Sequence, residues 1–377
     1  MARTRIVRHG LALVLVSSAL ASIGVAFTSI PADAAPIRAH RVAVGLKDPA
    51  GFTFTPSGKI WFLERGTGRI RILDPSTGGM HTFFRITGVD GNGERGALGI
   101  ALSRDWPHRK LVYVYVTRQS SSTAPLKNQL IRIVDRNGRG ASLKVLMQSP
   151  VSSATNHNGG RILNGPDGKL YIVIGENADP ANSQDLSRNL RGKILRVKAA
   201  GNRVDGLAAN NNPFGNRIWA YGIRNSFGFA FDPRTGRLWE TENGPECNDE
   251  LNLIVRGENY GWGPNESCGG TAPGDTNNSG PAPRLPASFF PSTIGITGGA
   301  FCDSCGLGGA NEGRLFFGDV NDGLLRSVAL NAARDDVAGS PATVLSAPGG
   351  AIYSMEVAPS GRIYFSDGTA IYRLVRT

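Results

Sequence analysis

The sequence is poor in several features that mark particular classes of protein. Charged residues make up only 19% of its 377 residues, and no run of lysine or arginine appears although the formal net charge is +11. A continuous basic segment is typical of nucleic-acid-binding tails, so its absence argues against nucleic acid as a partner. After residue 34 no stretch is apolar enough to span a membrane. We interpret the scattered positive charge as a solvated surface, with an anionic partner as the alternative.

The one long apolar segment lies at the N-terminus. Arginines at positions 3, 5 and 8 precede an uncharged stretch over residues 11–30, and Ala32-Asp33-Ala34 has the small-x-small pattern of a cleavage site. We therefore expect a cleaved signal peptide over residues 1–34 and a secreted, extracytoplasmic protein. A retained membrane anchor is the alternative, and the absence of cysteine near the cut argues against a lipid anchor. Cleavage would leave 343 residues (377 − 34) and a formal charge of +9 (11 − 3 + 1).

Cysteine is scarce, with four in the chain, at Cys247, Cys268, Cys302 and Cys305. An even number in an exported chain favours disulfides, and four cysteines allow three pairings. We prefer Cys247–Cys268 with Cys302–Cys305. A four-thiolate zinc site around Cys302-x-x-Cys305 is the alternative, but the other pair lacks the short spacing that such sites use.

Glycine, in contrast, is abundant at 50 residues, and the chain repeats one pattern six times. Each copy is an apolar strand, a Pro/Gly turn, a second apolar strand and, after a break, a third strand. The copies begin at residues 51, 99, 161, 228, 298 and 354, and the third strands are expected at 69–73, 130–134, 193–197, 250–255, 324–328 and 371–375. Successive copies start 48 to 70 residues apart (99 − 51; 298 − 228), which suits a four-stranded propeller blade of about 40–50 residues with loops added.

These repeats predict an all-β fold, a six-bladed β-propeller that forms a single domain over residues 35–377. A strand pair cannot bury both of its faces alone, whereas six sheets stacked radially bury them and leave only short edges. Closure of the ring needs an edge partner for the last blade, and we expect residues 40–46 (HRVAVGL) to supply it. A β-sandwich, or two separate β domains, is the alternative.

Four loops between the copies are unusually polar. They are GERGALG at 93–99, NHNGG at 156–160, YGIRN at 221–225, and a longer region that holds ENGP at 242–245, NDE at 248–250 and NYGW at 259–262. Three of them precede the first strand of a copy, and the fourth follows its second strand. In a propeller such loops reach one rim of the central channel, where ligands bind.

His157 is one of only five histidines, and it lies between two asparagines and before two glycines. Asparagine and glycine permit tight turns and close approach of the backbone. An imidazole that titrates near neutral pH suits a general base. The alternative is a surface histidine with ordinary hydrogen bonds.

Arg224 and a group of acidic residues are the other candidates. The rigid donor fork of arginine suits a developing oxyanion or a carboxylate ligand, although an ion pair with a neighbouring carboxylate would also explain Arg224. Glu242, Asp249 and Glu250, with loop carbonyls, offer the hard oxygen ligands that Ca²⁺ prefers. Turn capping and salt bridges are the alternative for these acids.

In their order along the chain, these loops resemble the glucose/sorbosone dehydrogenase family, soluble aldose sugar dehydrogenases that use pyrroloquinoline quinone (PQQ) and calcium. The resemblance runs from about residue 42 to 374. It rests on GERGALGIAL, NHNGGRI, GPDGKLYIVIGE, DLSRNLRGKILRV, NPFGNRIWAYGIRNSFGFAFDPRTGRLWETENGP, NDELNLI and ENYGWG. The resemblance implies a six-bladed propeller, which agrees with the number of repeats.

The resemblance also implies a reaction: oxidation of an aldose at its anomeric carbon to a lactone, with His157 as general base. The residues implied for catalysis are His157, Arg224 and Glu94; for the cofactor Arg224, Asn225, Gly244 and Pro245; and for calcium Gly244, Pro245, Glu250 and Tyr260, the last through its backbone. The implied partners are a small-molecule sugar and an electron acceptor, with no nucleic acid and no membrane span in the mature chain.

The chain departs from the family pattern in its last two copies. PQQ carries three carboxylates, and PQQ-using members hold them with a lysine and a pair of arginines. Here residues 318–323 contain no lysine and 351–356 no arginine. We expect the carboxylates to face Asn321, Tyr353 and Ser354 instead, and Phe289-Phe290 to be the nearest aromatic candidate. The departure leaves two alternatives, a non-redox binding propeller and a Ca²⁺-dependent lactone hydrolase, whereas the intact NHNGG and YGIRN loops favour the dehydrogenase.

Overall fold

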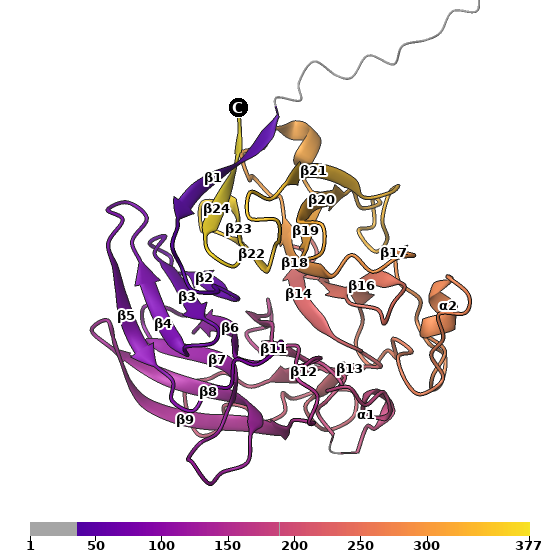
Figure 1. Cartoon of the computed structure of the whole chain (residues 1–377), viewed down its shortest axis with the longest axis horizontal. Helices are drawn as coiled ribbons and strands as arrows, with labels where there is room; N and C mark the ends of the chain where they lie inside the picture. The colour runs from indigo at the N-terminus through magenta and orange to yellow at the C-terminus, as the bar shows by residue number, and fades with distance from the viewer. Residues whose placement is uncertain (1–35, 188) are drawn as a thin grey trace, which may run out of the picture. The chain divides into compact units, whose positions relative to one another are not determined.

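Six four-stranded antiparallel sheets are arranged in a ring around a central axis (Figure 1). The structure is a computed structural model and describes residues 36–187 and 189–377; the predicted signal peptide lies outside these residues. The prediction of an all-β, six-bladed β-propeller is confirmed, and the sandwich and two-domain alternatives are wrong. In the described ranges no helix is long and apolar enough to cross a membrane.

Each blade contributes four strands in sequence order, except that the sixth takes its outermost strand from the N-terminal end. Blade 1 is β2 (Phe52–Phe54), β3 (Ile60–Glu64), β4 (Arg69–Leu73) and β5 (Met80–Arg85); blade 2 is β6 (Ala97–Leu102), β7 (Leu111–Arg118), β8 (Lys127–Arg136) and β9 (Arg139–Pro150). Blade 3 is β10 (Ile162–Asn164), β11 (Leu170–Ile174), β12 (Lys193–Val197) and β13 (Ile218–Tyr221); blade 4 is β14 (Ser226–Phe231), β15 (Leu238–Glu242), β16 (Asp249–Ile254) and β17 (Ser288–Phe290). Blade 5 is β18 (Ile296–Phe301), β19 (Leu315–Asp319), β20 (Leu324–Val328) and β21 (Ala342–Ser346); blade 6 is β22 (Ser354–Val357), β23 (Ile363–Ser366), β24 (Ile371–Arg376) and β1 (Ile37–Ala43). Three single turns of helix, α1 (Ala181–Gln184), α2 (Pro273–Thr276) and η1 (Gly309–Asn311), lie in loops.

The predicted third strands correspond to β4, β8, β12, β16, β20 and β24. The strand expected at 250–255 begins and ends one residue earlier. The closing strand is β1, which pairs antiparallel with β24 from Ile37 opposite Arg376 to Ala43 opposite Ile371. It starts three residues before the predicted segment and ends before Leu46, because the chain turns at Gly45 (φ 70°) toward the first blade.

The core lies between neighbouring blades. One buried cluster, for example, combines Tyr115 and Leu130 of blade 2 with Ile172 and Leu195 of blade 3. The first strands of neighbouring blades lie side by side near the axis, and glycine makes this approach possible. A Cβ atom on Gly228 would lie 2.1 Å from the carbonyl oxygen of Gly298, so no larger residue fits there without moving the backbone.

Successive strands of a blade run in opposite directions, so its turns fall at two ends. The connections between blades and the turns between second and third strands lie at one end, which we call the site face. The turns between first and second and between third and fourth strands lie at the other, the opposite face. All four polar loops of the sequence therefore reach the site face.

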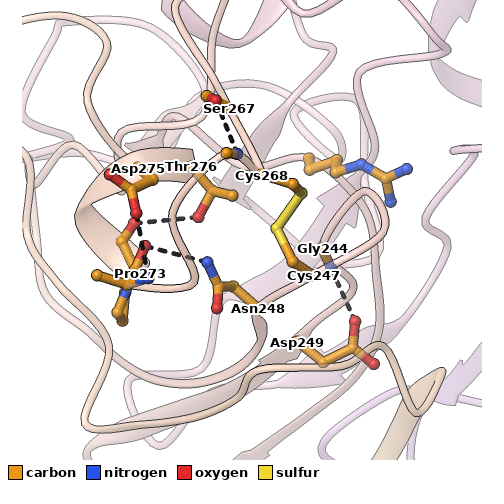
Figure 2. The surroundings of a disulfide bond; sticks show 12 residues. Gly244, Cys247, Asn248, Asp249, Ser267, Cys268, Pro273, Asp275 and Thr276 are labelled. Carbon is orange, nitrogen blue, oxygen red and sulfur yellow. Dashed lines mark hydrogen bonds between the residues drawn. A yellow bond between two sulfur atoms is a disulfide. The ribbon is translucent and has the colours of Figure 1, made fainter.

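Both predicted disulfides form, Cys247–Cys268 and Cys302–Cys305. The zinc alternative is therefore wrong, because the four sulfurs are bonded to one another in pairs. Figure 2 shows that Cys247–Cys268 ties the segment around α2 to the turn after β15. Asn248 strengthens this tie by donating its side-chain N–H to the Ala272 carbonyl at 3.1 Å.

Candidate active site

A cavity of about 500 Å³ opens at the site face and is lined by residues of all six blades. Of the predicted site residues, the structure brings six together in its lining: Glu94, His157, Arg224, Asn225, Gly244 and Pro245. Glu250 lines a smaller cleft beside this cavity, which shares Arg224, Gly244 and Pro245 with it. Tyr260 lines neither and is buried below.

His157 lies in the connection between β9 and β10, in a left-handed conformation (φ 55°). Its Nδ1 atom lies 2.8 Å from Oε1 of Glu176, and its side chain is 10% exposed. A carboxylate only accepts hydrogen bonds, so the neutral imidazole carries its hydrogen on Nδ1. The other ring nitrogen, Nε2, then has a free lone pair at the cavity that His157 lines, as a general base requires.

Glu176 is a functional candidate that the sequence analysis missed. It follows β11 at the site face and is 1% exposed, and its second oxygen accepts the backbone N–H of Ala178. Asn177 adds a further constraint by donating its side-chain amide to the His157 carbonyl at 2.7 Å. The glutamate ends the motif GPDGKLYIVIGE, so the available signal was an acid directly after a buried strand.

Glu94 and Asn225 fasten three loops to one another. Oε2 of Glu94 accepts the backbone N–H of His157 at 2.6 Å and the side-chain N–H of Asn225 at 3.1 Å. Oδ1 of Asn225 accepts the backbone N–H of Gly159 at 3.0 Å. Loops of blades 2, 3 and 4 are thereby locked around the imidazole, and both ends of the Asn225 amide are used within the protein.

Arg224 is buried against aromatic and polar groups. Its guanidinium lies 5.3 Å from the ring centroid of Trp262 and donates from Nη1 to the Asn243 carbonyl at 2.9 Å. Its Nε is buried without a hydrogen-bond partner, and within residues 36–187 and 189–377 no carboxylate forms an ion pair with it. Burial lowers the pKa of Arg224, an effect that nearby carboxylates oppose. A buried, unpaired donor on a permanent cation marks a place for an oxygen acceptor.

Three buried carboxylates lie beneath this arginine, those of Glu240, Glu242 and Glu250. The side-chain nitrogen of Asn252 lies 3.2, 3.3 and 3.1 Å from one oxygen of each, in that order. Burial, together with the nearby carboxylates, raises the pKa of Glu240 and of Glu250 to about 8 and also raises that of Glu242. Without a counter-charge these groups hold protons near neutral pH, whereas a bound cation would favour their ionised forms.

The small cleft beside Arg224 fits such a cation. The oxygen-bearing residues around it are Glu242, Asn243, Gly244, Pro245, Asn248, Glu250, Thr276 and Asn277. Oδ1 of Asn248 is buried there without a partner, and Figure 2 shows Asn248, Gly244 and Asp249 around the disulfide. Oxygen donors of this kind suit Ca²⁺. The Tyr260 hydroxyl donates to the Leu253 carbonyl at 2.6 Å and its backbone N–H to the Tyr221 carbonyl at 2.8 Å, so its backbone carbonyl is the group left for the predicted metal role.

Comparison with known proteins assigns the family. The family model described as Glucose / Sorbosone dehydrogenase matches residues 46–376. The chain belongs to this family. It is therefore an oxidoreductase, as the ordered motifs indicated.

Three relatives illustrate the match. Quinoprotein glucose dehydrogenase B of Acinetobacter calcoaceticus is 32% identical over 246 residues, which span 58% of this chain but only 50% of that protein. An aldose sugar dehydrogenase of Escherichia coli (strain K12) is 27% identical over 332 residues, 85% of this chain and 86% of that one. The structure of the PQQ-bound form of aldose sugar dehydrogenase from Streptomyces coelicolor superposes with a TM-score of 0.75 at 29% identity, covering 91% of this chain and 99% of that chain.

This family member differs from the expected pattern in the wall that blades 5 and 6 contribute to the cavity. Asn321 and Tyr353 line it as predicted. Ser354 does not, because it is buried in β22, where its hydroxyl accepts an N–H of Arg161 at 3.2 Å. Phe289 and Phe290 do not line it either, since β17 is the outermost strand of blade 4. Phe227, at the start of blade 4, is the phenylalanine in the lining.

Two cations besides Arg224 line the cavity, and neither comes from the last two blades. Nε of Arg65, in blade 1, lies 2.5 Å from a carboxylate oxygen of Asp48, and its Nη1 donates to backbone carbonyls. Arg161, in blade 3, lies 2.7 Å from a carboxylate oxygen of Glu356 across the channel. Each is neutralised by its own acid, so neither replaces the missing lysine or arginines as a free positive charge.

Proposed function

We propose that this family member is a secreted, PQQ- and Ca²⁺-dependent dehydrogenase that oxidises aldose sugars at the anomeric carbon to lactones. The observation that carries the proposal is that His157, whose Nδ1 is held by Glu176, lines the same cavity as Arg224, whose buried Nε has no hydrogen-bond partner. The names of the relatives support it, since one is a quinoprotein and another was solved with PQQ bound. Export rests on the signal-peptide pattern of residues 1–34.

At the Arg224 end of the cavity, the residues present fit PQQ. The buried Nε of Arg224 lacks an acceptor, and the neighbouring cleft offers oxygen ligands for Ca²⁺, which would neutralise part of the charge of a trianion. Asn321 and Tyr353 at the other end donate hydrogen bonds without charge. When bound, PQQ supplies a two-electron acceptor for the hydride of the anomeric carbon.

His157 would accept the proton of the anomeric hydroxyl at Nε2. As that O–H bond breaks, the anomeric C–H bond gives up a hydride and a C=O bond forms, which yields the lactone. The imidazolium so produced keeps its Nδ1–H bond to the carboxylate of Glu176, which stabilises the positive charge. Glu94 holds the backbone of His157, so the base stays in position during the transfer.

Arg224 would stabilise negative charge that develops on an oxygen beside it. The guanidinium is fixed by Asn243 and Trp262 and lies in a largely desolvated site, where a preoriented cation acts most strongly. Ca²⁺ held in the cleft around Gly244, Pro245 and Glu250 would add to the positive charge that Arg224 provides there. His157 would thus take up the proton of the anomeric hydroxyl, and Arg224 would stabilise the developing negative charge.

The test is titration of purified apo-protein with PQQ at saturating Ca²⁺, followed by absorbance and calorimetry and then by dye reduction with a panel of aldoses. We expect saturable binding that depends steeply on Ca²⁺ and aldose-dependent dye reduction. Absence of heat and of absorbance change at high micromolar PQQ would overturn the proposal in favour of a non-redox binding propeller. Lactone hydrolysis that needs Ca²⁺ but no PQQ would favour the hydrolase.

A further inference from the structure

The face opposite the active-site cavity carries a second cavity, of about 690 Å³, between blades 2 and 3. It is formed by the β6–β7 turn, the β10–β11 turn, the end of β12 and the segment that follows β12. Five cations line it: Arg104, Arg109, Lys169, Arg196 and Lys198. Asp105 is the only acidic residue in its lining. We call this cavity the basic cleft.

Two of the five cations are compensated by acids. Nε of Arg109 lies 2.5 Å from an oxygen of Asp105, and Nε of Arg196 lies 2.7 Å from an oxygen of Asp167. The side chains of the other three, Arg104, Lys169 and Lys198, form no hydrogen bond and no ion pair within the described part of the chain. Lys169 and Lys198 are only partly exposed. The basic cleft therefore keeps three uncompensated positive charges.

Like charges gathered in one concave site repel one another, and more strongly than at an open surface, because the protein walls exclude water. A bound anion removes this cost. We propose that the basic cleft is a binding site for a ligand with two or more phosphate groups.

The lining defines the chemistry of the ligand. Besides the charged residues it contains two asparagines, Asn210 and Asn211, and the small residues Gly168, Ala199 and Ala200, with no aromatic ring. Arginine forks and lysine ammonium groups bind phosphate oxygens, and side-chain amides donate further hydrogen bonds. A cleft without aromatic or large apolar surface offers nothing to a nucleobase or an acyl chain.

The position of the basic cleft separates it from catalysis. Its turns belong to the opposite face, whereas His157 and Arg224 belong to the site face. A ligand in the basic cleft leaves the mouth of the active-site cavity open. The cleft can therefore bind either a free diphosphate or a phosphate-rich polymer that attaches to the enzyme at this face. In both cases the cations of the cleft would bind phosphate oxygens.

The experiment is calorimetric titration of the full-length exported protein with inorganic diphosphate and, separately, with inorganic polyphosphate, in calcium-free buffer at low salt. The cleft variant Arg104→Glu, Lys169→Glu, Lys198→Glu is compared with a control, Arg136→Glu, Arg139→Glu, Lys144→Glu. The control residues are exposed in blade 2 outside the cleft, so both variants change the net charge equally.

We expect saturable binding by the wild type, weakened at least tenfold in the cleft variant and less than twofold in the control. Binding of diphosphate identifies a free ligand, and binding of polyphosphate alone identifies a polymer; both support the site if the cleft variant loses them. Equal weakening in both variants, or no binding of either probe by the wild type, would overturn the proposal. If the triple variant does not fold, Lys169→Gln with Lys198→Gln provides the same comparison with a smaller perturbation.

Discussion

The active-site cavity has two walls that differ in how their side chains are held. In the wall from blades 2 to 4, His157, Glu94 and Asn225 are joined to one another by hydrogen bonds, and Glu176 supports the ring from behind. In the wall from blades 5 and 6, Asn321 and Tyr353 carry no charge, and no hydrogen bond joins these two side chains to each other. The first wall holds its side chains in fixed positions, as the proposed proton transfer requires, whereas the second offers uncharged hydrogen-bonding groups to a ligand that lies against it.

The strongest test of this contrast is His157→Ala. Loss of a general base should lower kcat by about 10²–10⁴, with the fold unchanged because the backbone N–H to Glu94 remains. Steady-state dye reduction with the preferred aldose measures the effect. Asn321→Ala, in the uncharged wall, is the matched control and should change kcat far less. Near-wild-type turnover of His157→Ala would show that His157 is not the general base.

Glu176→Gln tests the same wall, because it keeps the size of the side chain and removes its negative charge. The amide cannot stabilise an imidazolium as a carboxylate does, and a charge-assisted hydrogen bond is worth about 1.5–3 kcal/mol, which corresponds to about 10–150-fold in kcat. KM and PQQ affinity should stay close to the wild-type values, since Glu176 does not line the cavity. A change in KM with kcat preserved would mean that Glu176 acts only on binding.

Tyr353→Arg converts part of the uncharged wall into a charged one. If the missing basic residues limit cofactor affinity, the added cation should tighten PQQ binding about tenfold, the lower end of what a charge-assisted hydrogen bond provides. Calorimetry at saturating Ca²⁺ measures the dissociation constant. Ser76→Arg, at an exposed turn of blade 1, controls for net charge. Equal affinity in Tyr353→Arg and wild type would show that this wall does not face a carboxylate.

The smallest effect concerns Glu240 and Glu250, two of the buried acids beneath Arg224. Their pKa values are raised by burial, so the folded state binds more protons than the unfolded chain. The stability they contribute is complete below about pH 4.5, the ordinary value, and is lost as pH rises through about 8. In chelator the melting temperature should therefore fall between pH 5 and 8, by about 1–2 °C per kcal/mol lost. Ca²⁺ should flatten the decline; a pH profile identical with and without Ca²⁺ would contradict the assignment of the cleft.

The number of blades could be predicted from sequence because each blade repeats the same strand–turn–strand pattern. The closing strand was located only approximately, since β1 lies at an edge and its pattern of apolar residues is weak. His157 and Arg224 were found because polar residues amid Asn and Gly stand out from the strands. Glu176 was missed because a single glutamate after a buried strand carries no pattern of its own.

Side-chain direction explains the errors on the uncharged wall. Tyr353 and Ser354 are adjacent, and neighbouring residues on extended backbone point to opposite sides, so only the tyrosine reaches the cavity. Phe289 and Phe290 lie close to the site in sequence but on an outermost strand. The basic cleft could not be predicted at all, because its cations come from segments almost a hundred residues apart (198 − 104).

The pairing of β1 with β24 has a consequence for the order in which the molecule is made. β1 is the first described strand to leave the ribosome and β24 the last, yet they are neighbours in one sheet. Until β24 has been made, the early strand has no partner and the unfinished ring has an exposed edge at each end. A chain that stops before β22 therefore forms an open arc, and β22, β23 and β24 are needed to close the ring around the cavity.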